Sequence, residues 1–340
     1  MTSKKILGVC IVGCGDLGTK HAERWNTLSN AQVVSVVDIK PERAEALARI
    51  CNLDVWHTDH RSAIEHDGVD VVSVCVPTGL HPEITIFAAE HGKHILCEKP
   101  IALTVEDAEA MIEAAQHNNV KLTVGFMRRY SPVLPVIKDW LATENGGKPV
   151  LYHATDFREI RPKREMHDTY ANGGPIIDMG VHLFDLWRYI FDSTPAEVFA
   201  QGFKLAQNRT ELKHINDIAY DTATIVVRYQ SGDVGNFVVT WGLPPGVVPP
   251  GKPDQILGTI GQAQIGYSMD NQSLEIMREG GALETVASSQ EDMYQRQITT
   301  FAQSILDHQV PHVTGEDGKN ALRVALAALE SLKSNQLIKL

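Results

Sequence analysis

Three residues that can exchange protons or bind hydroxyl groups lie close together in the sequence. Asp178, His182 and Asp185 stand at positions i, i+4 and i+7 of an apolar run that includes Phe184 and Trp187. On one helix they would share a face. Unpaired buried polar groups cost about 1–3 kcal/mol each, and unpaired charges cost more. Partners therefore neutralise these side chains, or the side chains line a cavity that binds a polar, hydroxyl-rich ligand.

Simpler interpretations of the same residues stay open. A histidine on an apolar helix is usually a core histidine, and Asp178 with His182 at this spacing would also suit two metal ligands. We predict no metal site, because the sequence offers no third-ligand motif such as HExxH. Asp185 either binds a second ligand hydroxyl or caps a local network.

A glycine-rich motif follows the apolar run 6–12, at the strand-to-helix position of a dinucleotide site. Its GxGxxG pattern assigns Gly13 to a tight turn, Gly15 to close approach of the pyrophosphate, and Gly18 to close helix packing. A purely structural glycine turn is the alternative. The predicted cofactor-binding residues of this segment are Gly13, Gly15, Asp16, Leu17 and Gly18.

Asp38 lies 20 residues after Gly18 and closes the second strand-like run. A carboxylate there accepts hydrogen bonds from the adenosine ribose and repels a 2′-phosphate, which favours NAD over NADP. The alternative for Asp38 is a turn or helix-capping aspartate, and the nearby Lys40 and Arg43 keep NADP open.

Strand-length apolar runs alternate with amphipathic helical stretches through the first half of the chain. This pattern predicts a doubly wound parallel sheet of the Rossmann type over residues 1–124, with residues 125–340 forming a second domain. Pro41 is expected at the start of one helix, and Thr104 with Asp107 resembles a capping box. The strand-like runs are 6–12, 32–37, 69–76, 94–97 and 121–125.

Two further motifs follow strand-like runs, at the carboxyl ends where such sheets bind ligands. The first contains Pro77, Thr78 and His81, and the second is Glu98-Lys99-Pro100. Most lysines are surface residues, but the place of Lys99 at a strand end before a proline favours a functional role. We predict that Pro77, Thr78, His81, Glu98 and Lys99 bind the cofactor.

The order and spacing of these motifs resemble the glucose-fructose oxidoreductase, inositol dehydrogenase and rhizopine catabolism family over nearly the whole chain. The resemblance rests on the GxGxxG motif, on Glu98-Lys99-Pro100 and on the GGxxxDxGxHxxD pattern at residues 173–185. It extends to residues 124–130 and to the motif at residues 315–318.

The resemblance implies a catalytic set of Lys99, Asp178 and His182, with the bond before Pro100 often cis. The histidine would take the hydroxyl proton while hydride leaves the same carbon. The residue types agree, since histidine titrates near neutral pH and an ammonium group stabilises a developing alkoxide. Asp178 either orients the ring of His182 or bonds the reacting hydroxyl.

Substrate contacts are expected from several further positions. Met127 stands where many relatives carry asparagine, which implies a more apolar pocket edge, and Arg129 matches the family's arginine there or bridges two domains. Charged residues after the first strand of the second domain either read the substrate or form a solvated loop. The predicted substrate-binding residues are Lys99, Met127, Arg129, His153, Asp156, Arg158, Asp178, His182 and Asp185.

The second half reads as an α+β domain with a large, mostly antiparallel open sheet. A turn is expected at 231–233, and five prolines in residues 243–253 exclude a central strand there. The resemblance suggests that subunits pair through this sheet as a homodimer or homotetramer. The expected strands are 150–158, 198–205, 219–229, 234–241, 256–260 and 273–277, and the expected closing helices are 293–307 and 320–334.

Composition limits the class of partner. At 340 residues two domains are expected, and a net charge of −11 argues against nucleic acid and anionic membrane surfaces. No apolar run is long enough for a membrane helix, and residues 1–6 lack the features of a signal peptide. Five cysteines without a CxxC pair indicate buried free thiols in a reducing cytoplasm.

The sequence therefore predicts an NAD-dependent dehydrogenase that oxidises a secondary hydroxyl of a cyclic polyol, an inositol or a pyranose sugar, to a ketone. The same site run as a reductase, or with tightly bound NAD for a redox-neutral step such as glycoside cleavage, is one alternative. A cofactor-dependent regulator without catalysis is the other, and Lys99, Asp178 and His182 argue against it.

Overall fold

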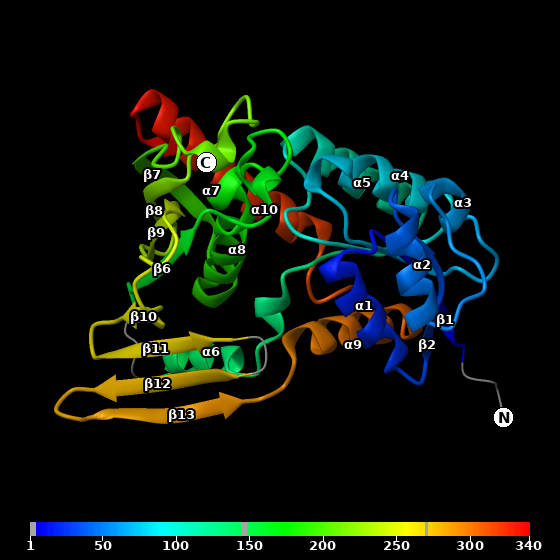
Figure 1. The fold of residues 1–340 in the computed structure, drawn as a ribbon. Coiled ribbons are helices and arrows are strands. Elements are labelled where there is room, and N and C mark those ends of the chain that lie inside the picture. The colour runs from blue at the N-terminus through cyan, green and yellow to red at the C-terminus, as the bar shows by residue number, and fades with distance from the viewer. Residues whose placement is uncertain (1–4, 144–147, 269–270) are drawn as a thin grey trace. The chain divides into compact units, whose positions relative to one another are not determined.

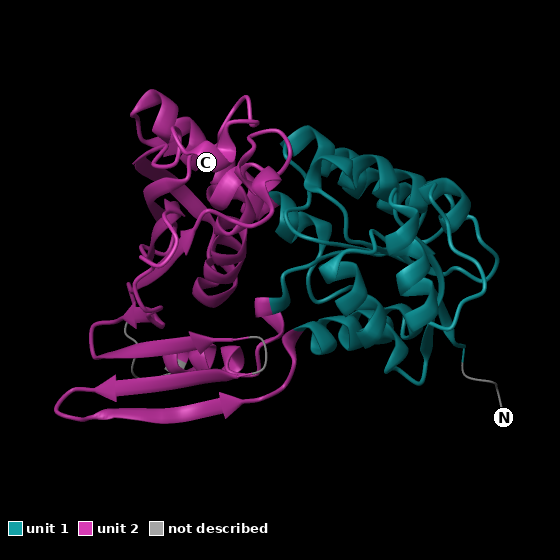
Figure 2. Cartoon of the chain, viewed as in Figure 1, with its two compact units in different colours: residues 1–127, 294–319 teal, residues 128–293, 320–340 magenta. Residues whose placement is uncertain are grey.

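The computed structural model describes residues 5–143, 148–268 and 271–340. The first four residues, where part of the signal-peptide prediction falls, lie outside this range. The chain forms two compact units, shown in Figure 2: unit 1 comprises residues 1–127 and 294–319, and unit 2 comprises residues 128–293 and 320–340.

Unit 1 contains, within the described residues, a five-stranded parallel sheet in the order β2-β1-β3-β4-β5, as predicted. Every residue of β1 and β3 is buried, because helices cover both faces of the sheet (Figure 1). The strands are β1 (Leu7–Val12), β2 (Ala31–Val37), β3 (Val71–Val74), β4 (His94–Cys97) and β5 (Leu122–Val124).

The helices of unit 1 begin where the local signals predict. Pro41 occupies the first turn of α2, and the hydroxyl of Thr104 accepts from the N–H of Asp107 at 3.1 Å at the start of α5. The elements are α1 (Asp16–Asn26), α2 (Pro41–Ile50), α3 (His60–Ile64), η1 (Thr78–Leu80), α4 (His81–Glu90), α5 (Val105–His117) and α9 (Met293–Leu306).

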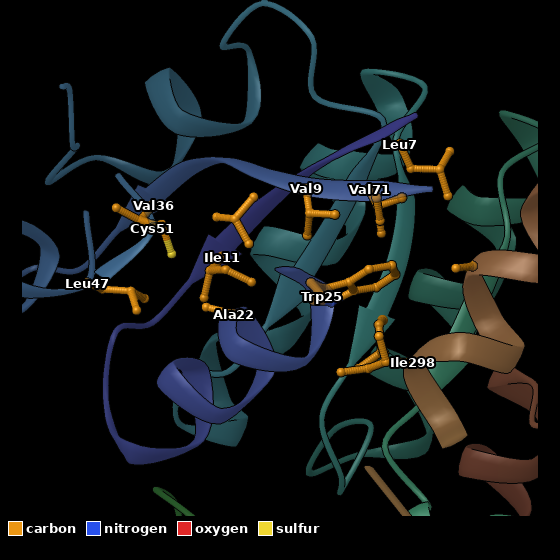
Figure 3. Close-up of a cluster of buried hydrophobic side chains, with 14 of the residues drawn as sticks. Leu7, Val9, Ile11, Ala22, Trp25, Val36, Leu47, Cys51, Val71 and Ile298 are labelled. Carbon is orange, nitrogen blue, oxygen red and sulfur yellow. The ribbon is translucent and has the colours of Figure 1, made fainter. Parts of the chain in front are cut away.

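Helix α9 corrects the predicted domain boundary. Ile298 and Phe301 are fully buried against β1 and α1, in the same core cluster as Leu7 and Trp25 (Figure 3). The segment 294–319 thus belongs to the dinucleotide-type unit, whereas we predicted one continuous second domain from residue 125. An amphipathic helix shows in its sequence that it must bury a face, but not which sheet it covers.

Unit 2 contains, within the described residues, a nine-stranded sheet in the order β13-β12-β11-β10-β6-β9-β8-β7-β14. It is mostly antiparallel, as predicted, although β6 and β9 pair in parallel. The strands are β6 (Leu151–Glu159), β7 (Pro195–Phe203), β8 (Thr222–Tyr229), β9 (Val234–Leu243), β10 (Asp254–Leu257), β11 (Gly261–Tyr267), β12 (Gln272–Arg278), β13 (Leu283–Ser289) and β14 (Ile338–Lys339).

The turn and loop predictions for unit 2 are confirmed. Gly232 adopts φ +89° in the turn between β8 and β9, and the N–H of Tyr229 donates to the carbonyl of Asp233 at 2.9 Å. Residues 244–253 form an exposed loop between β9 and β10, where the N–H of Gly246 donates to Glu159 at 2.7 Å.

Two helix predictions for unit 2 are wrong in detail. The run around Asp178 forms two short helices, because α7 ends at Asp178 and α8 begins at Gly180, with Met179 between them. Helix α10 begins at Gly315 rather than at residue 320, capped by the hydroxyl of Thr314. The remaining elements are η2 (Met127–Tyr130), α6 (Leu134–Thr143), η3 (Arg164–His167), α7 (Gly174–Asp178), α8 (Gly180–Phe191), η4 (Thr210–Leu212) and α10 (Gly315–Ser334).

Candidate functional site

The glycine-rich turn of unit 1 lies between β1 and α1, and its three glycines differ in their surroundings. Gly13 has φ +96°, and a Cβ on Gly18 would lie 1.8 Å from the carbonyl oxygen of Gly13. A Cβ on Gly15 would meet nothing within 4 Å. Gly13 and Gly18 are therefore required by the fold, whereas Gly15 leaves open space beside its backbone.

This open space fits a dinucleotide. Gly15 is the N-cap of the eleven-residue helix α1 and supplies no side-chain cap. The amide groups of an uncapped first turn, together with the helix dipole, form an anion site for a pyrophosphate. Asp16 is exposed and Leu17 half-buried at the start of the same helix.

Asp38 follows β2 and is tied to the glycine-rich turn. Its Oδ2 accepts from the backbone N–H of Cys14 at 2.9 Å, and its Oδ1 accepts from the N–H of Lys40 at 2.9 Å. The carboxylate thus has a fixed orientation at the carboxyl edge of the sheet. The next residue, Ile39, is 83% exposed and apolar.

The segments after β3 and β4 are joined by a buried histidine. Pro77 is exposed and Thr78 buried. Nδ1 of His81 lies 2.9 Å from the carbonyl oxygen of Pro100, and Nε2 lies 3.1 Å from that of Val76. His81 is 1% exposed, so the structure does not support the predicted direct contact of this ring with a cofactor.

Lys99 is half-buried at the end of β4, before a cis peptide bond to Pro100. Its backbone N–H donates to Oε2 of Glu98 at 3.1 Å. Glu98 is 3% exposed, and its Oε1 lies 3.1 Å from Nε2 of His21. Glu98, which we predicted as a cofactor contact, is therefore bonded inside unit 1, because its carboxylate points into the core beneath the motif.

His21 is a residue that the sequence analysis missed. Burial by itself lowers its pKa, but Cys75 and Glu98 outweigh burial and raise the pKa above its ordinary 6.5. Because burial raises the pKa of Cys75, its thiol is neutral at pH 7, and we attribute the protonated ring to Glu98. The available signal was a histidine on the helix that follows GxGxxG, which alone does not identify its partner.

Unit 2 holds the acid and base of the predicted site. Asp178 is 8% exposed and His182 is 6% exposed, on α7 and α8 respectively. Gly173 and Gly174 precede them with φ of +77° and +70°, and a Cβ on Gly174 would lie 2.6 Å from that of Ala219. Positive φ and this close approach explain the two glycines of the motif.

Arg129 and Asp185, both predicted to contact the substrate, bind each other. Nη1 of Arg129 donates to Oδ1 of Asp185 at 2.8 Å, and the side chains are 7% and 2% exposed. The guanidinium also lies 4.1 Å from the ring centre of Tyr189. Of the two interpretations of Asp185, the structure favours the local network. Arg129 and Asp185 both belong to unit 2, so their ion pair does not bridge the two units.

Asp156 and Arg158 come together at the end of β6. Oδ2 of Asp156 accepts from Nε1 of Trp241 at 2.7 Å, and Nε of Arg158 donates to both oxygens of Asp156. Arg161 lies over Trp241 at 5.5 Å. Burial and Arg158 lower the pKa of Arg161, while Asp156 and Asp178 raise it, so this group is electrostatically coupled to Asp178.

His153 lies on the other face of the sheet. It pairs with Asn236 across β6 and β9, and its Nδ1 is 2.8 Å from Oδ1 of Asn236. The residues before them in each strand, Tyr152 and Gly235, point to the opposite face and pack against Trp187 of α8. Because side chains alternate along a strand, the structure does not bring His153 to the face of His182.

The predicted catalytic set draws on both units. Lys99 belongs to unit 1, as does Met127 at its end, whereas Asp178 and His182 belong to unit 2. In the described ranges no group of three or more His, Cys, Asp or Glu side chains is arranged to hold a metal ion. No helix in the same ranges is long and apolar enough to cross a membrane.

Relatives with assigned activities resemble the chain along nearly its full length. It is 30% identical to the myo-inositol 2-dehydrogenase of Thermotoga maritima, with 97% of each chain covered. It is 28% identical to the NAD(+)-dependent scyllo-inositol 2-dehydrogenase of Bacillus subtilis, covering 97% of this chain and 95% of that one. The fold matches a solved levoglucosan dehydrogenase at 22% identity, with a TM-score of 0.86 and coverage of 98% and 99%.

Two family models cover most of the chain. Residues 7–126 match the oxidoreductase family with an NAD-binding Rossmann fold, and residues 141–340 match its C-terminal alpha/beta domain. The chain thus belongs to the glucose-fructose oxidoreductase, inositol dehydrogenase and rhizopine catabolism family, whose members are NAD(P)-binding oxidoreductases of sugars and polyols.

Proposed function

We propose that the protein oxidises one secondary hydroxyl of a cyclic polyol, an inositol or a pyranose sugar, with NAD as hydride acceptor. One observation carries the proposal: an aspartate and a histidine are buried together in an apolar segment of a chain whose other unit has dinucleotide-binding architecture. The inositol dehydrogenases at 28–30% identity support the polyol as substrate class.

The surroundings of Asp38 favour NAD over NADP. Its carboxylate is held at the end of β2 by two backbone N–H groups, and a 2′-phosphate beside it would be repelled. The following Ile39 is apolar, and the nearby Lys40 and Arg43 are the residues through which NADP would have to bind. We expect a lower KM for NAD than for NADP when both are assayed with one substrate.

Each catalytic residue has a distinct role in the proposed reaction. His182 in its neutral form takes the hydroxyl proton, the ammonium group of Lys99 stabilises the developing alkoxide, and Asp178 orients the imidazole or bonds the reacting hydroxyl. Bound nicotinamide supplies the hydride acceptor. Because the base must start unprotonated, oxidation should be favoured by mildly alkaline pH.

The deciding experiment measures NADH absorbance with purified protein across inositols, pyranoses and sugar phosphates, with the Lys99→Met and His182→Ala variants in parallel. Both variants should lose at least about a hundredfold in kcat, the lower range for a positioned acid or base. Lys5→Met is the matched control, since Lys5 is 63% exposed in a surface ion pair that contributes little. Full turnover in His182→Ala would contradict the assignment.

The same assay separates the alternatives. If NADH does not form but NAD survives desalting on the protein, the cofactor is held tightly, and a redox-neutral reaction or a reductase replaces the proposal. If NAD binds, exchanges freely and supports no chemistry in either direction, a cofactor-dependent regulator is the better description.

The proposal includes a homodimer or homotetramer formed through the outer face of the unit 2 sheet. An open groove of about 730 Å³ lies there, lined by residues of β7, β8 and β9 and by Leu332 and Asn335. Its apolar residues include Phe199, Phe203, Val226 and Val238, and its polar ones include Gln201 and Thr224. Phe199 and Phe203 are 36% and 57% exposed, and a second copy of the sheet would cover them. We place the protein in the cytoplasm, where buried free thiols stay reduced.

A further inference from the structure

A buried chain of polar contacts in unit 1 runs from β3 to the backbone of Lys99. His21 of α1 is 0% exposed, with Nδ1 at 2.8 Å from Oγ of Ser73 and Nε2 at 3.1 Å from Oε1 of Glu98. The other oxygen of Glu98 accepts from the N–H of Lys99 at 3.1 Å. The chain thus links the helix after the glycine-rich turn to the Glu98-Lys99-Pro100 motif.

The fold reserves space for the Glu98 carboxylate. A Cβ on Gly125, just after β5, would lie 2.7 Å from all three carboxyl atoms of Glu98. Any side chain at residue 125 would therefore displace the carboxylate. Glu98 is held by His21 on one side and by the Lys99 amide on the other, with glycine backbone against it.

Charge explains why the partner of Glu98 is a histidine. A buried carboxylate without a counter-ion is strongly destabilising, and an imidazolium supplies both the charge and two N–H donors. The acceptors match this state, since one donor meets a carboxylate and the other a hydroxyl. The other groups facing the ring are the neutral Cys75 and Tyr294, whose ring centre is 6.0 Å away.

We infer that His21 is a positioning residue for Lys99, acting through the carboxylate of Glu98 on the Lys99 backbone. The inference rests on the proposed function, since it assigns to Lys99 the role of alkoxide stabiliser. Holding the backbone N–H of Lys99 in place fixes the position of its Cα and Cβ. A small displacement of a group at a reacting centre lowers the rate strongly. If His21 only neutralised Glu98 in the core, replacing it would not change turnover.

Two matched variants separate these roles. In His21→Gln the new side-chain amide nitrogen reaches the place of Nε2 and still donates to Glu98, whereas in His21→Asn it reaches the place of Nδ1 and serves only Ser73. Both variants are neutral and polar. If positioning operates through Glu98, kcat should be about tenfold lower in His21→Asn than in His21→Gln, with similar NAD affinity. A tenfold change corresponds to about 1.4 kcal/mol, which one hydrogen bond to a charged group can supply.

Amide hydrogen exchange gives a readout that does not need turnover. The Lys99 amide should exchange about tenfold faster in His21→Asn than in His21→Gln, as expected for the loss of its acceptor's alignment. The Ile95 amide, which donates to the carbonyl of Lys121 at 2.8 Å in the same sheet, is the internal reference. Mass spectrometry with residue-level fragmentation resolves both sites.

The outcomes are distinct. Equal kcat and equal Lys99 exchange in the two variants would overturn the inference. If the wild-type protein forms no NADH with any polyol, the proposed function fails and the exchange rates alone decide the positioning role. If His21→Asn does not fold, Glu98→Ala replaces it: the Lys99 N–H then has no Glu98 oxygen to donate to, and unchanged Lys99 exchange there would also overturn the inference.

Discussion

Arg129 and Asp185 were both predicted to contact the substrate, but in the structure they form an ion pair with each other. Both side chains are almost fully buried, at a donor–acceptor distance of 2.8 Å. Removing one member of a buried ion pair weakens the charge compensation of the other in the interior, which costs free energy. The pair therefore ties Arg129 to α8, the helix that carries both Asp185 and His182.

We predict that Arg129→Met and Asp185→Asn will each lower the free energy of unfolding by about 3–5 kcal/mol. The double variant should lose less than the sum, because the contact between the two side chains is already lost in either single variant. Urea unfolding of all four proteins measures the coupling energy. Additive losses would show that the two residues act independently.

His21 makes a prediction about pH. Its pKa in the folded protein is raised above an ordinary 6.5, so its contribution to stability is complete below pH 6.5 and is lost as pH rises through the folded-state pKa. The difference in unfolding free energy between the wild-type protein and His21→Gln should therefore shrink as the pH rises above 6.5. Urea titrations at several pH values measure it, and a constant difference would argue against a protonated ring.

At the scale of elements, two glycines of the glycine-rich turn are expected to act differently, Gly15 on cofactor binding and Gly18 on folding. Gly15→Ala should change the melting temperature little, because a Cβ there meets no atom within 4 Å, but should weaken NAD binding by obstructing the pyrophosphate. Gly18→Ala should destabilise unit 1 strongly, since its Cβ would lie 1.8 Å from a carbonyl oxygen. Thermal melts with and without NAD test both, and unchanged NAD affinity in Gly15→Ala would move the binding site elsewhere.

Local signals were sufficient for most elements of unit 1 and for part of unit 2. Strand β4 was predicted with its observed bounds, and the caps at Pro41 and Thr104 lie where predicted. Strand β13 was missed because it is exposed along most of its length and lacks an apolar pattern. The start of α10 was missed because Gly315 and Gly318, poor helix formers, are needed for contact with Ile112 and Val124.

The candidate site was predictable by residue type but not by pairing. Motif spacing proposed Lys99, Asp178 and His182 as the catalytic set, which stays a prediction, and the structure shows that Asp178 and His182 are buried. Spacing does not show that Arg129 binds Asp185, or that Glu98 points to His21, 77 residues away in the chain. Such contacts depend on tertiary packing, which no local pattern encodes.

At the scale of the whole molecule, the sheet of unit 2 presents more apolar surface than its own helices cover. Helix α8 packs on one face through Trp187, which fills the space left by Gly235. The groove beside Phe199 and Phe203 lies on the other face of the sheet, because side chains alternate between the two faces along β7. The two exposed phenylalanines of this groove are apolar surface that a second copy of the sheet would cover.

We predict that Phe203→Glu combined with Val238→Glu will shift the protein toward monomer in light scattering after size exclusion. Burial of a charge without a partner opposes association, and an interface of ordinary size depends on a few central apolar residues. Val310→Glu is the matched control, because Val310 is 77% exposed and belongs to unit 1 rather than to the unit 2 sheet. If the wild-type protein is already a monomer at micromolar concentration, or if the double variant keeps the wild-type mass, the assembly does not use this face. If the monomeric variant retains turnover, the catalytic set is complete within one chain and the paired sheets serve stability.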